Sequence, residues 1–200
     1  MREVTLEELK EIAENSRVAV WGKANSVGRE PRITLHWSAG YYNTLFSDYQ
    51  ISITGDGDIY VSTEDLSEVL PHTWKANSGN VGISLCCAYG ATSEDLGDYP
   101  PTDKQIEIMA QVIATVANGL RLTIDKDHIA THGEIADDTS VYDEEDLHGC
   151  QNGCERWDLQ YLGTEESPYY TSDYDNPITG GNVLRGKALW YRNKWEQESK

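Results

Sequence analysis

The sequence predicts a single α/β domain. Its 200 residues are the length of one ordinary domain and can bury a sizeable core. Strand-like apolar runs and segments with apolar residues at helical spacing follow one another along the chain, and no internal repeat interrupts them. We expect residues 31–164 to form the core of this domain. Residues 1–30 would pack on it, and residues 165–200 would form a C-terminal extension.

The first thirty residues predict a helix and then a strand. Thr5-Leu6-Glu7-Glu8 has the pattern of a capping box, in which Thr5 caps a helix and Glu8 reaches back to it. A short helix is therefore expected from about Leu6 to Asn15. Residues 18–22, Val-Ala-Val-Trp-Gly, have the character of a strand.

Five more strands are expected in the core. Residues 32–37 end with His36, which places an imidazole at the exit of a rigid element. Residues 49–53 and 59–61 flank Gly55-Asp56-Gly57-Asp58 and predict a hairpin. Residues 80–87 predict a buried central strand, and residues 127–132 a short strand that again ends in a histidine.

A long helix is predicted after Tyr99-Pro100-Pro101, with Thr102 or Asp103 as its cap and Gly119 near its end. Its apolar residues form one stripe at helical spacing, which indicates a core face: Ile106, Met109, Ala110, Ile113, Val116, Ala117 and Leu120. Residues 165–176 are polar and tyrosine-rich, and predict a surface loop. Residues 184–191 are expected to pack back on the domain.

The charge of the chain excludes several partners. With 16 basic and 34 acidic residues, the net charge is -18. Nucleic acid and anionic membrane surfaces both require a basic face, so neither is expected as a partner. No apolar run approaches the roughly 20 residues that span a bilayer, and the N-terminus lacks the pattern of a signal peptide. We therefore expect cytoplasmic synthesis, no membrane insertion and a monomer.

The four cysteines do not predict a disulfide framework in a chain of this size. Cys86 and Cys87 are expected to be small buried hydrophobic residues. Pairing of Cys150 with Cys154, or a position near a metal, stays open. A second metal cluster with His148 is disfavoured, because the spacing fits no common zinc motif.

Three motifs far apart in the chain each offer one good zinc ligand. They are Leu35-His36-Trp37-Ser38, Thr131-His132-Gly133-Glu134 and Arg156-Trp157-Asp158. Two imidazoles and one carboxylate, with a fourth position for water, suit a hydrolytic zinc rather than a structural one. Either histidine alone is better explained as structural, but the combination with Asp158 favours metal ligation. His128 is expected to face away from His132 or to lie in the core.

Three further motifs lie between the first two: Asp48-Tyr49-Gln50, residues 72–77 (His-Thr-Trp-Lys-Ala-Asn) and residues 81–85 (Val-Gly-Ile-Ser-Leu). Taken in this order, all six motifs resemble those of the type 2 N-acetylmuramoyl-L-alanine amidases. Peptidoglycan recognition proteins and phage lysis amidases share that fold. The resemblance covers about residues 33–162. It implies a central mixed β-sheet flanked by helices, and a zinc ion held by His36, His132 and Asp158. It also implies hydrolysis of the amide between the lactyl group of N-acetylmuramic acid and L-alanine, within a zinc amidase core at residues 31–164.

The resemblance also implies roles in catalysis. Where many members have Lys-x-Asp, this chain has Arg156-Trp157-Asp158, and Arg156 offers charge and donors but no proton, which suits oxyanion stabilisation. Tyr49 is the first candidate for the general base and Glu134 the second. As alternatives, Tyr49 only packs in its strand, and Glu134 orients a ligand histidine. Four residues are expected to bind substrate: Trp37, His72, Trp74 and Asn77.

The predicted function is that of a zinc-dependent peptidoglycan amidase, a phage or prophage endolysin that a holin releases to the cell wall. A cytoplasmic amidase that recycles wall fragments fits the same features. A different class is a recognition module that binds peptidoglycan without cutting it. Such members have usually lost a zinc ligand, whereas all three candidates are present here. A zinc hydrolase acting on another amide is the third alternative.

Overall fold

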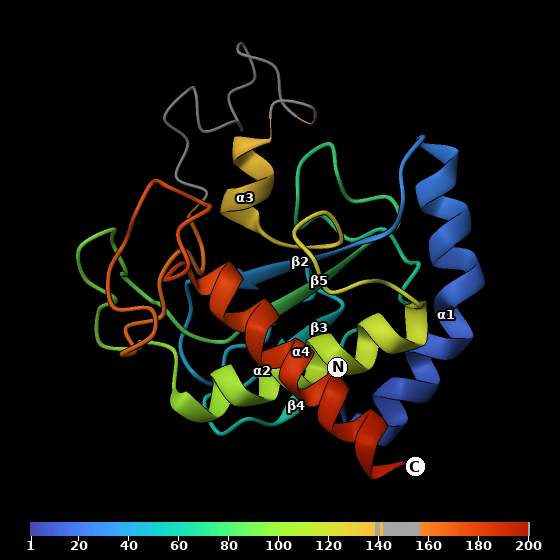
Figure 1. Cartoon of the computed structure of the whole chain (residues 1–200), viewed down its shortest axis with the longest axis horizontal. Helices are drawn as coiled ribbons and strands as arrows, with labels where there is room; N and C mark the ends of the chain where they lie inside the picture. The colour runs from blue at the N-terminus through green and yellow to red at the C-terminus, as the bar shows by residue number, and fades with distance from the viewer. Residues whose placement is uncertain (139–140, 142–156, 200) are drawn as a thin grey trace.

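One mixed β-sheet with helices packed on it forms the protein (Figure 1). The computed structural model describes residues 1–138, 141 and 157–199. Within them the strands are β1 Arg2–Val4, β2 Arg32–Trp37, β3 Ile51–Ile53, β4 Ile59–Val61, β5 Asn80–Leu85 and β6 Ile129–Thr131. The helices are α1 Leu6–Ser26, α2 Asp103–Leu120, α3 His132–Asp137 and α4 Gly180–Glu198. The expected α/β fold with a mixed sheet is confirmed.

The strand order is β1-β4-β3-β5-β2-β6. β3, β5, β2 and β6 run parallel to one another, while β4 is antiparallel to both β3 and β1. The carboxyl ends of the four parallel strands therefore meet at one edge of the sheet. In β2 and β6, Leu35 pairs with Thr131, so the residues that follow them, His36 and His132, come to lie side by side.

All six residues of β5 are buried, because the strand has parallel neighbours on both sides and is covered on both faces. Three of them, Val81, Ile83 and Leu85, are apolar. The predicted central strand and the predicted hairpin of β3 and β4 are both confirmed. Cys86 and Cys87 follow β5 and are buried, as expected.

Helix α2 crosses one face of the sheet and packs against α1 and α4 (Figure 1). Thr102 caps it in a capping box with Gln105. The helix ends with Arg121 in the left-handed conformation (φ 60°), one residue after Leu120. Gly119, expected near the end of the helix, is its second-last residue and lies where α1 approaches closely. A Cβ at this position would lie 2.5 Å from the Cβ of Ala13.

The strand predicted for residues 18–22 is wrong, because these residues continue helix α1, which runs to Ser26 rather than ending near Asn15. The buried residues of α1 recur at helical spacing: Leu9, Ile12, Ala13, Ser16, Val20 and Ala24. Burial of this stripe overrides the local strand propensity of Val18 and Val20, and Val18 is left 79% exposed. Strand β1, which was not predicted, pairs with β4.

The C-terminal residues take part in the same structure. Residues 165–176 form neither helix nor strand, in agreement with the predicted loop. Residues 184–191 lie in α4, which packs on α2 and β6. Glu107 of α2 binds both Lys187 Nζ (2.7 Å) and the Tyr191 hydroxyl (2.8 Å) of α4.

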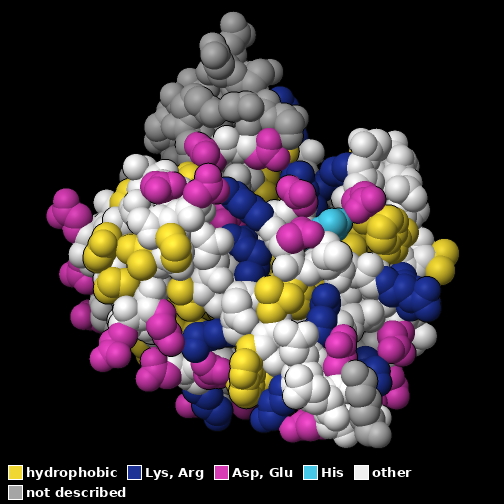
Figure 2. Space-filling view, in the orientation of Figure 1, with side chains coloured by type: hydrophobic (Ala, Val, Ile, Leu, Met, Phe, Trp, Pro, Cys, Tyr) yellow, Lys and Arg dark blue, Asp and Glu magenta, His cyan; other side chains and the backbone are white. Residues whose placement is uncertain are grey.

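Acidic side chains are spread over the face shown in Figure 2 rather than gathered in one patch. This distribution agrees with the net charge of -18. Among the residues that the structure describes, no helix is long and apolar enough to cross a bilayer.

A pH-dependent contribution to stability is expected from His128, which lies outside the candidate site. Its Nε2 is 2.8 Å from Glu30 Oε2, and its Nδ1 is 2.7 Å from Asp125 Oδ1. Partial burial lowers the pKa of His128, but the hydrogen bonds to Glu30 and Asp125 outweigh burial and raise it above its usual value.

Because the pKa of His128 is higher in the folded than in the unfolded protein, protonated His128 stabilises the fold. This contribution is fully present below the unfolded pKa of about 6.5. That stability is lost as the pH rises through the folded pKa. We therefore expect His128→Gln to cost more unfolding free energy near pH 5.5 than near pH 8.5, by up to about 1 kcal/mol. Urea denaturation of both proteins at each pH measures the difference, and an equal cost at both values would contradict it.

Candidate metal centre

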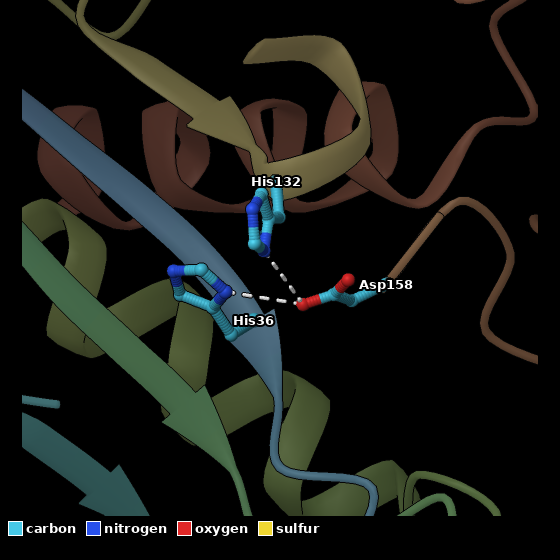
Figure 3. A group of neighbouring side chains, drawn as sticks. All are labelled: His36, His132 and Asp158. Carbon is cyan, nitrogen blue, oxygen red and sulfur yellow. Dashed lines mark hydrogen bonds and ion pairs between the residues drawn. The ribbon is translucent and has the colours of Figure 1, made fainter. Parts of the chain in front are cut away.

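Three side chains from separate segments converge at the carboxyl edge of the parallel strands (Figure 3). His36 lies near the end of β2, His132 begins α3 directly after β6, and Asp158 reaches in from a following loop. The two imidazole centroids are 4.8 Å apart, as the strand register dictates. One potential ligand atom from each residue lies within 4.8 Å of the others.

The spacing of these atoms fits a zinc ion. Asp158 Oδ2 lies 3.0 Å from His36 Nδ1 and 3.5 Å from His132 Nδ1. Donors placed tetrahedrally at about 2.0–2.1 Å from zinc are separated by about 3.3 Å from one another. The His132 and Asp158 side chains keep 10% and 13% of their surface exposed, so the centre is reachable from solvent. The set therefore suits a metal ion with an open coordination position.

His72 packs against the candidate ligand His36. Burial, and then the neighbouring His36, hold the pKa of His72 well below its usual range, so the ring is neutral at pH 7. Its Nε2 donates to the carbonyl of Asn80 (3.3 Å), because a carbonyl can only accept. Nδ1 of His72 is then an acceptor, with the Thr73 hydroxyl 2.9 Å away and His36 Nε2 3.2 Å away.

His36 Nδ1 faces the carboxylate oxygen of Asp158 at 3.0 Å. Without a metal ion, a proton on Nδ1 makes this contact a hydrogen bond, which agrees with the lowered pKa of Asp158. A divalent cation can take the place of that proton, and the ring then carries its proton on Nε2, 3.2 Å from His72 Nδ1. The close packing also needs a glycine in β5, since a Cβ at Gly82 would lie 2.8 Å from the ring of His72.

The charge state of Asp158 suits a ligand. Burial raises the pKa of Asp158, but the charge and hydrogen bond of His132, together with His36, outweigh burial and hold the pKa well below its usual range. The carboxylate is therefore ionised at neutral pH. Metal ligands must be deprotonated in this way to bind.

Glu134 stabilises the turn that carries His132. Its Oε2 accepts from the backbone N–H of Thr131 (2.8 Å), and Thr131 Oγ1 accepts from the N–H of Glu134 (3.1 Å). Arg185 of α4 donates to both carboxylate oxygens, Nη1 to Oε2 at 2.8 Å and Nη2 to Oε1 at 2.7 Å. Both side chains of this ion pair are buried. The Thr131-x-x-Glu134 spacing is a capping-box signal that could have predicted the first contact.

The first turn of α4 also contacts the segment that carries Asp158. Gly180 N–H donates to the carbonyl of Gln160 (3.1 Å). A Cβ at Gly180 would lie 1.9 Å from the carbonyl oxygen of Leu159, and one at Gly181 would lie 2.8 Å from Glu134 Oε2. Helix α4 therefore packs directly against the neighbours of two candidate ligands. Nothing in the sequence pointed to this role for α4 or for Arg185.

The remaining predicted residues lie at different depths. The ring of Tyr49 is 5.0 Å from that of His36, so Tyr49 borders the centre. Trp37 is buried and meets Trp157 edge to face at 5.2 Å. Trp74 is 55% exposed, whereas Asn77 Oδ1 accepts from the backbone N–H of Thr73 at 2.7 Å.

Four residues considered in the sequence lie outside the described residues: Arg156, His148, Cys150 and Cys154. The role expected for Arg156 therefore rests on the sequence. A groove of about 690 Å³ lies between α1, α2 and α4 and contains none of the three candidate ligands.

Comparison with known proteins gives one match. The family model described as N-acetylmuramoyl-L-alanine amidase matches residues 22–146, more than half of the chain. No curated protein and no solved structure matches. The matched span includes His36 and His132 and ends before Asp158.

Loss of Arg185 is expected to affect both stability and metal binding. Arg185→Met leaves the Glu134 carboxylate buried without its partner, which should lower the free energy of unfolding by about 3–5 kcal/mol. Zn²⁺ affinity, measured by competition with a chromophoric chelator, should fall about 10- to 100-fold, because the turn that carries His132 loses its support.

The matched control on the same helix is Lys194→Met, a largely exposed position where a change within about 0.5 kcal/mol is expected. Adding Glu134→Gln to Arg185→Met should recover part of the lost stability, since it removes the unpaired charge. Equal effects of Arg185→Met and Lys194→Met would show that the ion pair does not support the centre.

Proposed function

We propose that this chain, which belongs to the N-acetylmuramoyl-L-alanine amidase family, is a zinc-dependent amidase that cleaves the lactyl–L-alanine bond of peptidoglycan. The observation that carries the zinc assignment is the convergence of His36, His132 and Asp158, whose potential ligand atoms all lie within 4.8 Å of one another. The family supplies the class of substrate and bond.

A zinc ion held by His36, His132 and Asp158 would supply a Lewis acid for the amide carbonyl and a hydrolytic water of lowered pKa. The residues of the chain prepare the site for that chemistry. His72 Nδ1 lies 3.2 Å from His36 Nε2 and orients the imidazole with its Nδ1 toward Asp158, which contributes the negative charge. Arg185 and Glu134 fix the turn that carries His132.

We assign the general base to Tyr49 rather than to Glu134. The ring of Tyr49 lies 5.0 Å from that of His36, beside the centre. Both oxygens of Glu134 are already engaged by Arg185 and by the Thr131 N–H, which suits a positioning role. Arg156, two residues before Asp158 in the chain, is assigned to stabilise the oxyanion, because its guanidinium offers fixed charge and several donors.

Substrate contact is assigned mainly to Trp74, because it is the most exposed of the four residues expected to bind substrate. The buried His72 orients His36, and the buried Trp37 supports Trp157 next to Asp158. Asn77 holds the turn at residues 73–77 and would act on substrate only through Trp74.

We further infer that the polymeric cell wall is the substrate, as for a phage or prophage endolysin that acts as a monomer after release by a holin. The support is the resemblance of Arg156-Trp157-Asp158 to phage members of the family. A wall-recycling amidase would prefer soluble muramyl-peptides. The ratio of kcat/KM on intact sacculi to kcat/KM on those fragments separates the two roles.

Zinc dependence is tested by metal removal. The purified protein should hold one zinc per chain and clear a suspension of sacculi, and a chelator should abolish clearing until zinc is returned. Mass spectrometry should find new L-alanine amino termini. His36→Ala and Asp158→Ala should each lose zinc and activity while keeping the far-UV circular dichroism spectrum. Cleavage that persists after complete removal of zinc would refute the proposal, and zinc with wall binding but no cleavage would indicate a recognition module.

The base assignment is tested with Tyr49→Phe, which removes only the hydroxyl. We expect zinc content to stay at one per chain and kcat to fall about 10²- to 10⁴-fold, the usual contribution of a general acid or base. Tyr60 lies in β4, which β3 and β5 separate from β2 in the sheet. Tyr60→Phe is therefore the matched control and should keep the wild-type rate. A wild-type kcat for Tyr49→Phe would exclude Tyr49 as the base.

A further inference from the structure

An exposed aromatic surface lies beyond the carboxyl ends of β2 and β5. The two strands continue to pair past their ends, where Gly40 N–H donates to Cys87 O (3.0 Å) and Tyr89 N–H donates to Gly40 O (3.2 Å). Tyr41 and Tyr89 stand at this point with stacked rings, 4.5 Å between centroids and 28° between planes. Their side chains are 45% and 51% exposed.

Tyr99 completes this surface, which we call the tyrosine platform (Tyr41, Tyr89 and Tyr99). Its ring meets that of Tyr41 edge to face at 5.0 Å, and its carbonyl accepts from Ala88 N–H at 2.6 Å. Tyr42, whose ring lies 5.3 Å from Tyr99 and whose hydroxyl donates to Pro100 O, supports it. The platform is therefore held by backbone and side-chain contacts while two of its rings stay open to solvent.

The platform is continuous with the metal centre through one loop. Residues 38–48 leave β2 two residues after His36 and return at Tyr49, whose ring lies against His36. Tyr41 follows His36 by five positions, so their Cα atoms cannot be more than about 18 Å apart. Both ends of this loop therefore lie at the centre, and a ligand that extends from the centre along the loop meets the platform.

The backbone next to the platform is strained. Ala39 and Ala88, one on each of the paired segments, have φ values of 52° and 68°. Residues other than glycine rarely adopt this left-handed conformation, and strain of this kind is concentrated at functional sites. Both alanines immediately precede the segment that presents Tyr41 or Tyr89.

The charge around the platform limits the class of ligand. Residues 38–49 and 86–102 contain four acidic residues, Asp48, Glu94, Asp95 and Asp98, and no lysine, arginine or histidine. Such a surface repels anionic ligands, including nucleic acid, acidic peptides and anionic lipids. It places no penalty on a neutral one.

We propose that the tyrosine platform binds the glycan strand of peptidoglycan, as neutral N-acetylhexosamine rings next to the bond that is cleaved; this proposal rests on the proposed amidase function. A pyranose ring has an apolar C–H face that packs on an aromatic face, and tyrosine adds a hydroxyl for the hydroxyl and N-acetyl groups of the sugar. The platform is thus a second binding surface, which favours an extended glycan over a short fragment.

The test uses a neutral probe, the hexamer of β-1,4-linked N-acetylglucosamine, with binding measured by isothermal titration calorimetry on the zinc-loaded and on the chelator-treated protein. Tyr41→Ala and Tyr89→Ala should each bind about five- to tenfold more weakly than wild type, because each removes one aromatic face. Tyr41→Phe keeps that face and should retain most of the affinity. Tyr169→Ala, at a tyrosine that is 61% exposed outside the platform, is the matched control and should bind as wild type.

The outcomes separate this proposal from the proposed function. Equal binding of the hexamer by wild type and both alanine variants would overturn the proposal that the platform binds glycan. The proposal would also fail if the protein cleaved sacculi but did not bind the hexamer, and in that case the amidase function would stand. If the wild-type protein bound the hexamer but cleaved no sacculi, and the alanine variants lost binding, glycan binding by the platform would be upheld and the amidase function would fail. A wild-type dimer that Tyr41→Ala converts to a monomer would reassign the surface to self-association and overturn the proposal.

Discussion

His36 and His132 lie side by side because β2 and β6 pair in parallel with Leu35 opposite Thr131. Parallel neighbours end at the same edge of a sheet, so the residues after this pair project from adjacent positions. A shift of the register by one residue would turn His36 to the other face of the sheet and separate the imidazoles. Every other feature of the centre, including the place of Asp158 and the hydrogen bond to His72, presupposes this pairing.

The centre also depends on a helix that lies outside the span matched to the family. Arg185 of α4 holds Glu134, and the glycines that begin α4 lie against Glu134 and Leu159. These contacts support the neighbours of His132 and Asp158. The C-terminal residues therefore belong to the architecture of the site, and changes in α4 should be felt in metal affinity as well as in stability.

Much of this arrangement was predictable from local patterns. The strand pattern of residues 80–87, the Asp-Gly turn of the hairpin and the helical stripe of α2 each indicate one structure, and the structure agrees. Local patterns misled at residues 18–22, because burial of one face of α1 outweighed strand propensity. Arg185 was not predictable, since its partner Glu134 lies 51 residues earlier and a single sequence carries no information on such pairs. The sequence also does not show whether an aromatic residue next to a candidate ligand is buried or exposed, and Trp37 is buried.

The central claim is that a metal ion lies between His36, His132 and Asp158. Anomalous diffraction at the zinc absorption edge, on crystals grown with zinc and soaked free of excess metal, tests it most directly. The account predicts one zinc peak, with two nitrogen ligands at about 2.0–2.1 Å and a carboxylate oxygen at about 2.0–2.2 Å. An empty centre, or a zinc ion bound only at other residues, would contradict it.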